Sequence, residues 1–295
     1  MTLRSAVGPM QAETPRDLDA ALRFLAEHAG ESWIPVAGGT DLLVAINNGS
    51  SPGDRWLNLW PLRNALNGVR DTGDGWSVGA MTTMTELRRA AAEHEDFPAV
   101  VAEAAAVVGG LQIQNRATVA GNVVNASPAG DTLPVWAVLD AEVVLASVRG
   151  TRAVPFPEFY LGYRKLDREP DELVTGLRFS KPAPGGAWFF HKVGTRAAQA
   201  ISKAVLAGRV RVAKDGTFEE VRLAAGSLAP TPVRLRTVEA ALAGEPAGEE
   251  SVGRALDLLD RDITPIDDIR STRDYRMSVT RNLLAHHLLA AVRPL

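Results

Sequence analysis

The chain has 295 residues, of which 46% are hydrophobic and 23% charged, and its formal net charge is −3. This length allows two or three packed subdomains, and a nearly balanced charge with interspersed signs argues against nucleic acid as a partner. Cysteine is absent, which excludes disulfides, thiolate zinc sites and a cysteine-ligated iron–sulfur cluster within this chain.

The start of the chain, residues 1–15, has no basic segment followed by an apolar one, so we expect no secretory signal. No stretch approaches 18 consecutive apolar residues, and no spanning helix is expected. The sequence therefore predicts a cytoplasmic protein.

The first predicted element is a helix that begins at residues 14–17. Thr14 is expected to cap it, with Pro15 at the first helical position and Asp17 completing a capping box. Strand-like runs follow at 33–37 and 56–59. We expect a small βαβ-like unit over residues 1–55.

A second α/β subdomain is predicted over residues 56–180. Thr83 and Glu86 form a capping box that starts a helix. The other predicted elements are a strand at 76–79, a buried helix at 97–108, a short helix at 134–139 and strands at 142–148 and 173–179. A Pro/Gly-rich hairpin at 181–186 is expected to join the last of these strands to another at 188–192.

Residues 181–295 are predicted to form an α+β domain. Asp215-Gly216 indicates a hairpin between strands at 201–213 and 218–225. Helices are expected at 235–243, 249–260 and 272–292, the last capped by Ser271 with Asp274. The fold class is thus α+β, with two N-terminal α/β subdomains followed by an antiparallel sheet with packed helices.

Two glycine-bearing segments indicate a ligand. The first, residues 37–43, follows a strand and precedes a possible helical turn, so its N–H groups suit contact with phosphate oxygens. It matches neither the Rossmann nor the P-loop pattern. The alternative is a tight turn that needs glycine for its geometry alone.

The second segment, residues 118–131, places several polar residues in an apolar neighbourhood, among them Asn122, Asn125, Ser127 and Asp131. Buried polar groups need partners, which a pyrophosphate, ribitol or ribose would supply. The Asp131 carboxylate is suited to accept a hydrogen bond from a sugar or ribitol hydroxyl. The alternative is an Asx-rich turn that satisfies its own polar groups.

At these segments the sequence resembles the FAD-binding, or medium, subunits of molybdenum hydroxylases, which include the flavoproteins of xanthine dehydrogenase and carbon monoxide dehydrogenase. The resemblance covers nearly the whole chain. It is carried by AGGTDLL at 37–43, TVAGNVVNASPAGD at 118–131, FYLGYRK at 159–165, FHKVGTR at 190–196 and STRDYR at 271–276.

The resemblance implies that the two N-terminal subdomains hold FAD, without covalent attachment, between them. Residues 36–43 would line the pyrophosphate: Val36, Ala37, Gly38, Gly39, Thr40, Asp41, Leu42 and Leu43. Thr118, Gly121 and Asn122 would lie on the other side of the dinucleotide, and Asp131 would hold a hydroxyl. Val108 and Val174 match positions that pack around the adenine or the flavin. Lys192 matches a lysine near the flavin, although a lone lysine is otherwise a solvated surface residue.

The function implied is electron transfer within a larger oxidoreductase, from iron–sulfur clusters of a partner subunit through FAD to NAD, a quinone, a small carrier or oxygen. The molybdenum cofactor and the 2Fe-2S clusters would lie in a large and a small partner subunit, in a dimer of heterotrimers. No residue of this chain is expected to act as a catalytic acid or base, because the flavin carries the chemistry.

Two alternatives stay open. One is a free-standing flavin oxidase or dehydrogenase of a small organic substrate, and the other is a flavin-free scaffold with the same fold. Two features are given structural interpretations. His286 and His287 are expected to pack on a helix, and the arginines at 270–276 are expected to lie on a solvated helix face.

Overall fold

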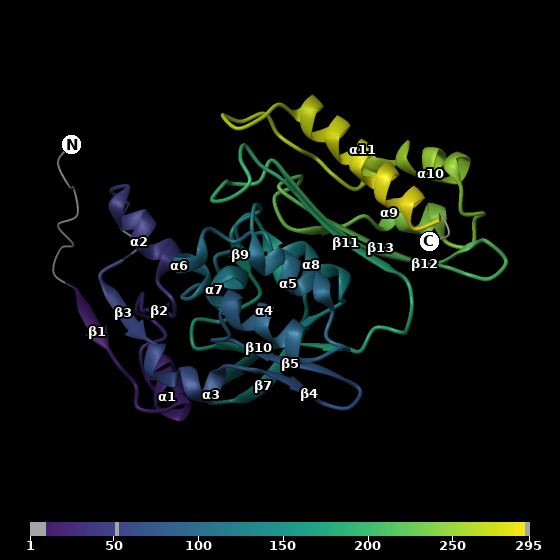
Figure 1. Cartoon of the computed structure of the whole chain (residues 1–295). Coiled ribbons are helices and arrows are strands. Elements are labelled where there is room, and N and C mark those ends of the chain that lie inside the picture. The colour runs from purple at the N-terminus through teal and green to yellow at the C-terminus, as the bar shows by residue number, and fades with distance from the viewer. Residues whose placement is uncertain (1–9, 51–52, 293–295) are drawn as a thin grey trace.

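The structure is a computed structural model that describes residues 10–50 and 53–292. Its first sheet is parallel and lies at the N-terminal end of the molecule (Figure 1). Its order is β1 (Gln11–Glu13), β3 (Arg55–Asn58) and β2 (Ile34–Val36). Most of the stretch in which no secretory signal is expected, residues 1–9, lies outside the described residues. The boundary that we place after residue 55 falls inside β3.

Two helices accompany this sheet, α1 (Leu18–Glu27) and α2 (Thr40–Asn47). The expectation that Thr14 caps α1 is wrong. Asp17 is the cap, and its carboxylate accepts a hydrogen bond from the Ala20 N–H at 2.7 Å. A carboxylate satisfies the orphan N–H groups of a first turn and also suits the helix dipole.

The second sheet is antiparallel, with the order β4-β5-β10-β6-β7. Its strands are β4 (Val69–Asp71), β5 (Gly75–Gly79), β6 (Glu142–Ser147), β7 (Gly150–Pro155) and β10 (Leu173–Ser180). The helices of this part are α4 (Met84–Glu93), α5 (Ala99–Ala106), α6 (Leu111–Gln114), α7 (Val119–Val124) and α8 (Leu133–Val138). The predicted capping box of Thr83 and Glu86 is confirmed at the start of α4.

The C-terminal sheet is antiparallel, with the order β11-β12-β13-β14. Its strands are β11 (Ala187–Val193), β12 (Ala204–Val212), β13 (Phe218–Gly226) and β14 (Val233–Arg234). The hairpin at Asp215-Gly216 is confirmed, since β12 pairs with β13 on either side of it. The hairpin at 181–186 is wrong. β10 and β11 belong to different sheets, so this segment links two layers of the molecule.

The C-terminal helices are α9 (Arg236–Leu242), α10 (Glu249–Leu256) and α11 (Arg273–Ala290). Thr272, rather than Ser271, caps α11 and accepts a hydrogen bond from the Tyr275 N–H. The remaining short elements are η1 (Trp60–Leu62), α3 (Arg63–Leu66), β8 (Tyr160–Gly162), β9 (Lys165–Leu166) and η2 (Leu259–Arg261).

The layers explain how the two larger sheets are held together. Helices α5 and α8 lie between the second sheet and the C-terminal sheet, and α9 to α11 cover the other face of the C-terminal sheet (Figure 1). One core includes Trp76 and Trp136 with Ala207 and Ala224 of the C-terminal sheet, so it spans both sheets. The predicted α+β class, with an antiparallel C-terminal sheet and packed helices, is confirmed.

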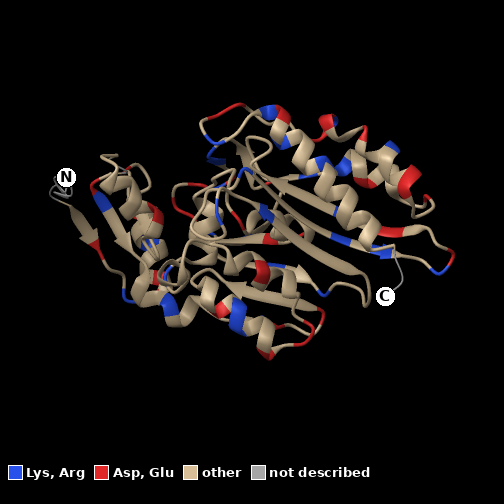
Figure 2. Cartoon of the chain, turned by 45° about the horizontal axis from the view of Figure 1, so that its top comes forward, with Lys and Arg blue, Asp and Glu red and all other residues tan. Residues whose placement is uncertain are grey.

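Charge is distributed without a large patch of one sign on the face that Figure 2 shows, where basic and acidic residues alternate over the helices and loops. Within residues 10–50 and 53–292, none of the helices combines the length and the apolar content needed to span a bilayer.

Candidate functional site

The first glycine segment makes a left-handed turn that ends β2 and begins α2. Gly39 has φ +74° and occupies the N-cap of α2, a conformation that a residue without a Cβ adopts most easily. Among the described residues, no side chain caps this helix end. The first-turn N–H groups of an eight-residue helix, from Thr40 onward, are therefore available to an anion.

Gly38 brings the first predicted segment against the residues that directly precede the second. A Cβ on Gly38 would lie 1.9 Å from the Arg116 carbonyl oxygen and 3.3 Å from the Ala117 nitrogen. This close approach is possible only without a side chain. The first segment and the residues just before the second, 78 positions apart at Gly38 and Arg116, therefore meet at their backbones.

Arg116 adds a second contact between these regions. Its guanidinium carbon lies 3.6 Å from the centroid of the Trp60 ring, a stacked cation–π arrangement. Because Trp60 follows β3, the strand next to β2, this stack holds the approach to the second segment against the first subdomain.

The second segment is largely a short helix and not an open loop. Thr118 caps α7 by accepting a hydrogen bond from the Gly121 N–H at 3.1 Å. The N–H groups of Val119 and Ala120 donate to the carbonyls of Thr82 and Ala80. This turn is therefore fixed by residues that precede α4, and its backbone donors are already used.

Side chains in this segment also find partners within the protein. Asn122 accepts a hydrogen bond from the Thr132 hydroxyl at 2.6 Å, and Ser127 accepts one from the Ala129 N–H at 3.3 Å. The alternative of a self-satisfied turn thus describes Thr118, Asn122 and Ser127 in this structure. Gly121 and Asn125 of this segment are partly exposed.

Asp131 and Lys192 come together at the other end of the site. Lys192 Nζ lies 2.7 Å from Asp131 Oδ2 and also donates to the Val107 carbonyl oxygen at 3.0 Å. Both side chains are about nine-tenths buried. Lys192, on β11, is therefore no solvated surface residue but part of a buried ion pair that joins β11 to the segment before α8.

Burial raises the pKa of Asp131, while the charge of Lys192 and hydrogen bonds from Lys192 and Ser202 oppose the rise. The Ser202 hydroxyl donates to Asp131 Oδ1 at 2.7 Å. Each carboxylate oxygen thus has one donor and keeps a second lone pair. This arrangement leaves Asp131 able to accept a further hydrogen bond from a ligand hydroxyl.

The remaining predicted residues lie in different settings. Val108 is partly buried and follows Val107, the residue that Lys192 contacts. Val174 is buried in the core on β10, and little of its side chain faces outward. Ala37 packs against the smaller core under the first sheet, and Leu43 is exposed on α2.

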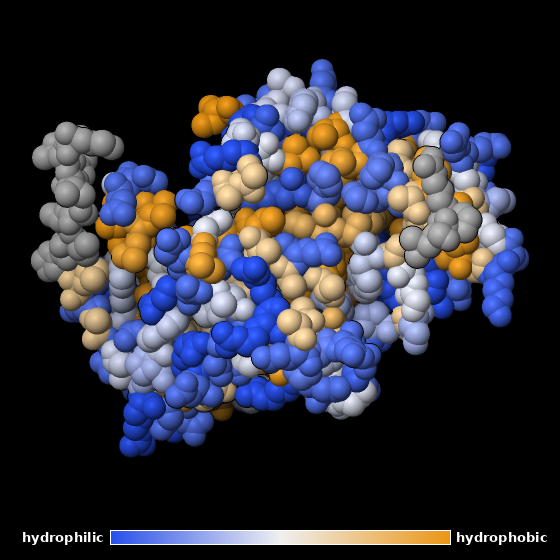
Figure 3. All heavy atoms as spheres, in the orientation of Figure 1, coloured by the Kyte–Doolittle hydropathy of each residue, from blue (hydrophilic) through white to orange (hydrophobic). Residues whose placement is uncertain are grey.

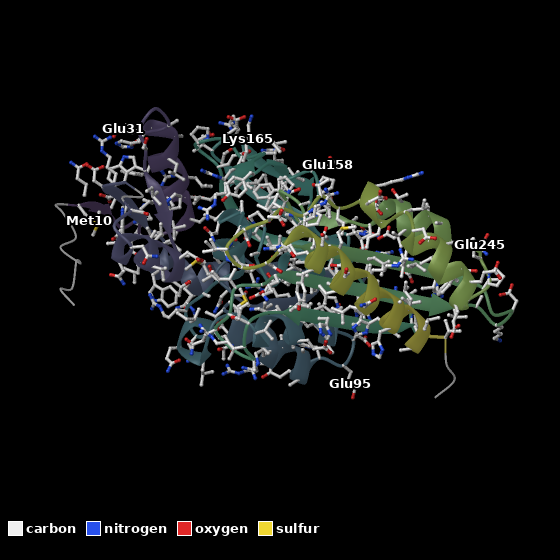
Figure 4. All side chains as sticks on the ribbon, turned by 90° about the horizontal axis from the view of Figure 1, so that it is seen from above. Met10, Glu31, Glu95, Glu158, Lys165 and Glu245 are labelled. Carbon is white, nitrogen blue, oxygen red and sulfur yellow. The ribbon has the colours of Figure 1, made fainter. Side chains whose placement is uncertain are left out.

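The β8–β9 hairpin, which carries the motif at 159–165, lies close to α2. Desolvation raises the pKa of Asp41, and the nearby Arg164 guanidinium of this hairpin opposes the rise. Leu161 and Tyr163 of the same hairpin are exposed. In Figure 4 Lys165 lies between the N-terminal unit, marked by Glu31, and the C-terminal helices, far from Glu245.

Several apolar side chains of the described residues are exposed. They include Leu43 and Val44 of α2, and Figure 3 shows the corresponding apolar surface over that helix. A larger set of exposed apolar residues follows along the chain: Leu111, Ile113, Val124, Leu161, Tyr163 and Ile201.

Two residues that the sequence did not single out, Arg116 and Ser202, support this geometry, and Arg276 holds the backbone beside Ser202. Arg276 was expected on a solvated helix face, and this is wrong, because its side chain is buried. It donates to the carbonyl oxygens of Lys203 and Ser227. The position of Arg276 inside the motif at 271–276 was the available signal, but its charge suggested the surface.

A cavity of about 480 Å³ lies elsewhere, between the segment after β10 and the C-terminal sheet. Trp188, Arg209 and Glu220 line it, and no predicted cofactor residue does. Its arginines are paired with neighbouring carboxylates, as Arg209 is with Glu220 at 2.7 Å.

Comparisons with known proteins place these features in context. Residues 8–182 match the family model described as the FAD binding domain in molybdopterin dehydrogenase, and residues 189–291 match the CO dehydrogenase flavoprotein C-terminal domain.

Similar proteins are found over most of the chain. A xanthine dehydrogenase FAD-binding subunit of Escherichia coli O157:H7 is 30% identical over 282 residues, covering 92% of this chain and 93% of that protein. The carbon monoxide dehydrogenase medium chain of Hydrogenophaga pseudoflava is 26% identical and covers 94% of this chain and 95% of its own length.

A solved structure has the same fold. A chain of the carbon monoxide dehydrogenase from Hydrogenophaga pseudoflava, in a form lacking the Mo-pyranopterin moiety of its molybdenum cofactor, superposes with a TM-score of 0.87 at 27% identity. The match covers 96% of this chain and 97% of that chain.

Proposed function

Because the chain belongs to the family of FAD-binding subunits of molybdopterin dehydrogenases, we propose that it carries electrons from iron–sulfur clusters of a partner subunit, through FAD, to an external acceptor such as NAD or a quinone. When bound, FAD supplies a ring that accepts and releases electrons. The chain's own residues bind this ring, orient it and set the charge around it.

The uncapped N-terminus of α2 is the observation that carries the proposal. Its first-turn N–H groups adjoin Gly38, whose missing side chain admits the Arg116 backbone. A diphosphate placed there would receive backbone hydrogen bonds and the favourable end of the helix dipole. We assign Gly38, Gly39 and Thr40 to this contact, with Val36 and Ala37 before them and Asp41, Leu42 and Leu43 after them.

We assign the opposite wall to the segment around α7, with Thr118, Gly121, Asn122, Asn125 and Ser127. Thr118, Asn122 and Ser127 use their side chains within the protein, so their part is to shape the backbone surface. Asp131 would accept a hydrogen bond from a ribitol or ribose hydroxyl.

The flavin end of the cofactor would lie near Lys192, with Val108 and Val174 contributing apolar packing. A buried ammonium favours negative charge that develops on a neighbouring ring. Because Lys192 is held by Asp131 and by the Val107 carbonyl, its charge is fixed in position before the cofactor binds.

The partners proposed are a large subunit with the molybdenum cofactor and a small subunit with 2Fe-2S clusters, in a dimer of heterotrimers. The names of the relatives, such as FAD-binding subunit and medium chain, describe parts of larger enzymes. The absence of cysteine from the sequence requires that any thiolate-ligated cluster lie in another chain.

Purification of the untagged protein from its native source tests the proposal. We expect a yellow preparation with the absorbance of FAD, together with a large and a small chain whose metal analysis gives molybdenum and iron. A colourless preparation of a single chain would contradict the proposal. Reduction of the isolated chain by a small organic donor would instead favour a free-standing flavin enzyme.

A further inference from the structure

Ser202 lies where the C-terminal domain contacts the cofactor site. It immediately precedes Lys203 and β12, and its side chain is only 2% exposed. Its hydroxyl donates to Asp131 Oδ1 at 2.7 Å across 71 positions of sequence. The hydrogen bond therefore joins the segment before β12 to the segment before α8, which are distant in the sequence.

The Asp131 carboxylate receives two donors from the described residues, one at each oxygen. Lys192 Nζ contacts Oδ2 and Ser202 contacts Oδ1. Lys192 also uses a second N–H for the Val107 carbonyl, which leaves its third N–H for a ligand. Loss of the Ser202 hydroxyl would leave one carboxylate oxygen unpartnered in a buried position, which is costly.

The backbone on both sides of Ser202 fixes the position of its hydroxyl. Lys203, the next residue, is anchored by a hydrogen bond from the buried Arg276 to its carbonyl oxygen. Ile201, the preceding residue, is exposed. The chain therefore turns inward at Ser202 and brings its hydroxyl to Asp131 from a fixed position.

We propose that Ser202 is a positioning residue of the FAD site, which holds the Asp131 carboxylate so that Asp131 in turn holds the Lys192 ammonium toward the flavin. This inference rests on the proposed function. Ser202 touches neither the reacting ring nor the acceptor, and it acts through Asp131.

A pH-dependent consequence follows from the burial of Asp131. Burial raises the pKa of this carboxyl and the Ser202 hydroxyl lowers it, so removal of the hydroxyl raises the pKa further. Asp131 then takes up a proton at a higher pH than in the wild type. Once it is neutral, it no longer pairs with the charge of Lys192, and the site loses its arrangement.

The test measures the dissociation constant of FAD at pH 8 and pH 6 by quenching of flavin fluorescence, in the native assembly after the cofactor has been removed. For Ser202→Ala we expect a larger loss of FAD affinity from pH 8 to pH 6 than in the wild type, because the Asp131 carboxyl has lost a hydrogen-bond donor that lowers its pKa. Ser202→Thr keeps the hydroxyl and is expected to lose no more affinity over this interval than the wild type. Ser251→Ala removes a buried hydroxyl from α10 and is the matched control.

A double-mutant cycle with Asp131→Asn separates positioning from general stability. If Ser202 acts through Asp131, Ser202→Ala has no further effect on FAD affinity in the Asp131→Asn background. Circular dichroism checks that each variant is folded, and Ser202→Gly replaces Ser202→Ala if the latter does not fold. Additive effects, or a Ser202→Ala profile equal to that of the wild type, would overturn the inference alone. A wild-type assembly that takes up no FAD would overturn the proposed function as well.

Discussion

At the scale of single residues, the site depends on atoms that are missing as much as on those present. Gly38 has no Cβ, and the Arg116 carbonyl occupies the space where one would lie. Gly39 takes a left-handed conformation with φ +74°. Both positions require glycine for the space or the backbone conformation that it allows, and not for the chemistry of a side chain. The sequence predicted the importance of both glycines but left open whether geometry alone explained them.

Substitution of Gly38 by alanine is expected to destabilise the fold by about 2–3 kcal/mol, the cost of an overpacked contact against backbone. It should also abolish FAD binding, because the two segments would have to separate. Thermal unfolding and a flavin titration measure the two effects. Gly30→Ala is the control, because nothing lies within 4 Å of its added Cβ. Equal stability of the two variants would contradict this account of Gly38.

At the scale of elements, the sequence predicted correctly those features whose interacting residues are close together in the chain. The capping box of Thr83 and Glu86 is one such feature, and the hairpin at Asp215-Gly216 is another. Where partners lie far away in the sequence, the local pattern failed. The helix α7 (Val119–Val124) donates its first two N–H groups to the carbonyls of Thr82 and Ala80, and no spacing within the segment predicts this.

In helix α11, too, the local sequence pattern failed to predict contacts with distant residues. Arginine suggested a solvated face, yet Arg276 is buried and bonds to two carbonyl oxygens and to Asp268. Desolvation acts to raise the pKa of Asp268, but hydrogen bonds from Arg270, Arg276 and Ser271 outweigh it and hold the pKa at about 2. The start of α11 is thus fixed to the residue before β12 and to the residue after β13.

Replacement of Arg276 by methionine should lower the free energy of unfolding by about 2–4 kcal/mol, because it leaves buried carbonyls and Asp268 without their donor. Urea unfolding at neutral pH measures this loss. Arg273→Met, one turn away on an exposed position of the same helix, should change stability by about 0.5 kcal/mol or less. A similar loss in both variants would show that Arg276 has no special role.

The histidines of α11 and β11 predict a pH effect on the C-terminal domain. His287 stacks on Phe189 with ring centroids 4.3 Å apart, which agrees with the expected packing role. Burial, with a smaller contribution from the charges of the nearby His191 and His286, lowers the pKa of His287 to about 4. Between about pH 6.5 and pH 4, His287 is therefore protonated in the unfolded chain and neutral in the folded chain.

Stability should accordingly fall as the pH decreases from 7.5 to 5, by about 1 kcal/mol after allowance for solvent screening at this half-buried site. In the His287→Phe variant the aromatic stack is kept and this part of the fall should disappear. Melting temperatures at the two pH values measure the difference. A fall of equal size in wild type and variant would assign the pH effect to other groups.

At the scale of the whole molecule, the C-terminal sheet supplies residues to the proposed cofactor site. Lys192 and Ser202 reach Asp131 from β11 and from the residues before β12, while α5 and α8 are packed between the two larger sheets. The sequence predicted the order of the three parts and the α+β class. It did not predict that α5 and α8 would be shared, because this depends on packing between distant strands.

The resemblance named Asp131 and Lys192 separately, and the structure brings them together as a buried pair. Their contact could not be derived from the sequence, since 61 positions separate them. The same holds for Gly38 and Arg116, which meet only after the first subdomain packs against the second.

The most direct measurement of the central claim is an experimental structure of the native assembly with FAD bound. We expect density for the diphosphate within hydrogen-bond distance of the backbone at Gly39 and Thr40, with α7 on its other side and the flavin toward Lys192. Density for FAD in the cavity beside Trp188, or a diphosphate that contacts neither glycine segment, would contradict it.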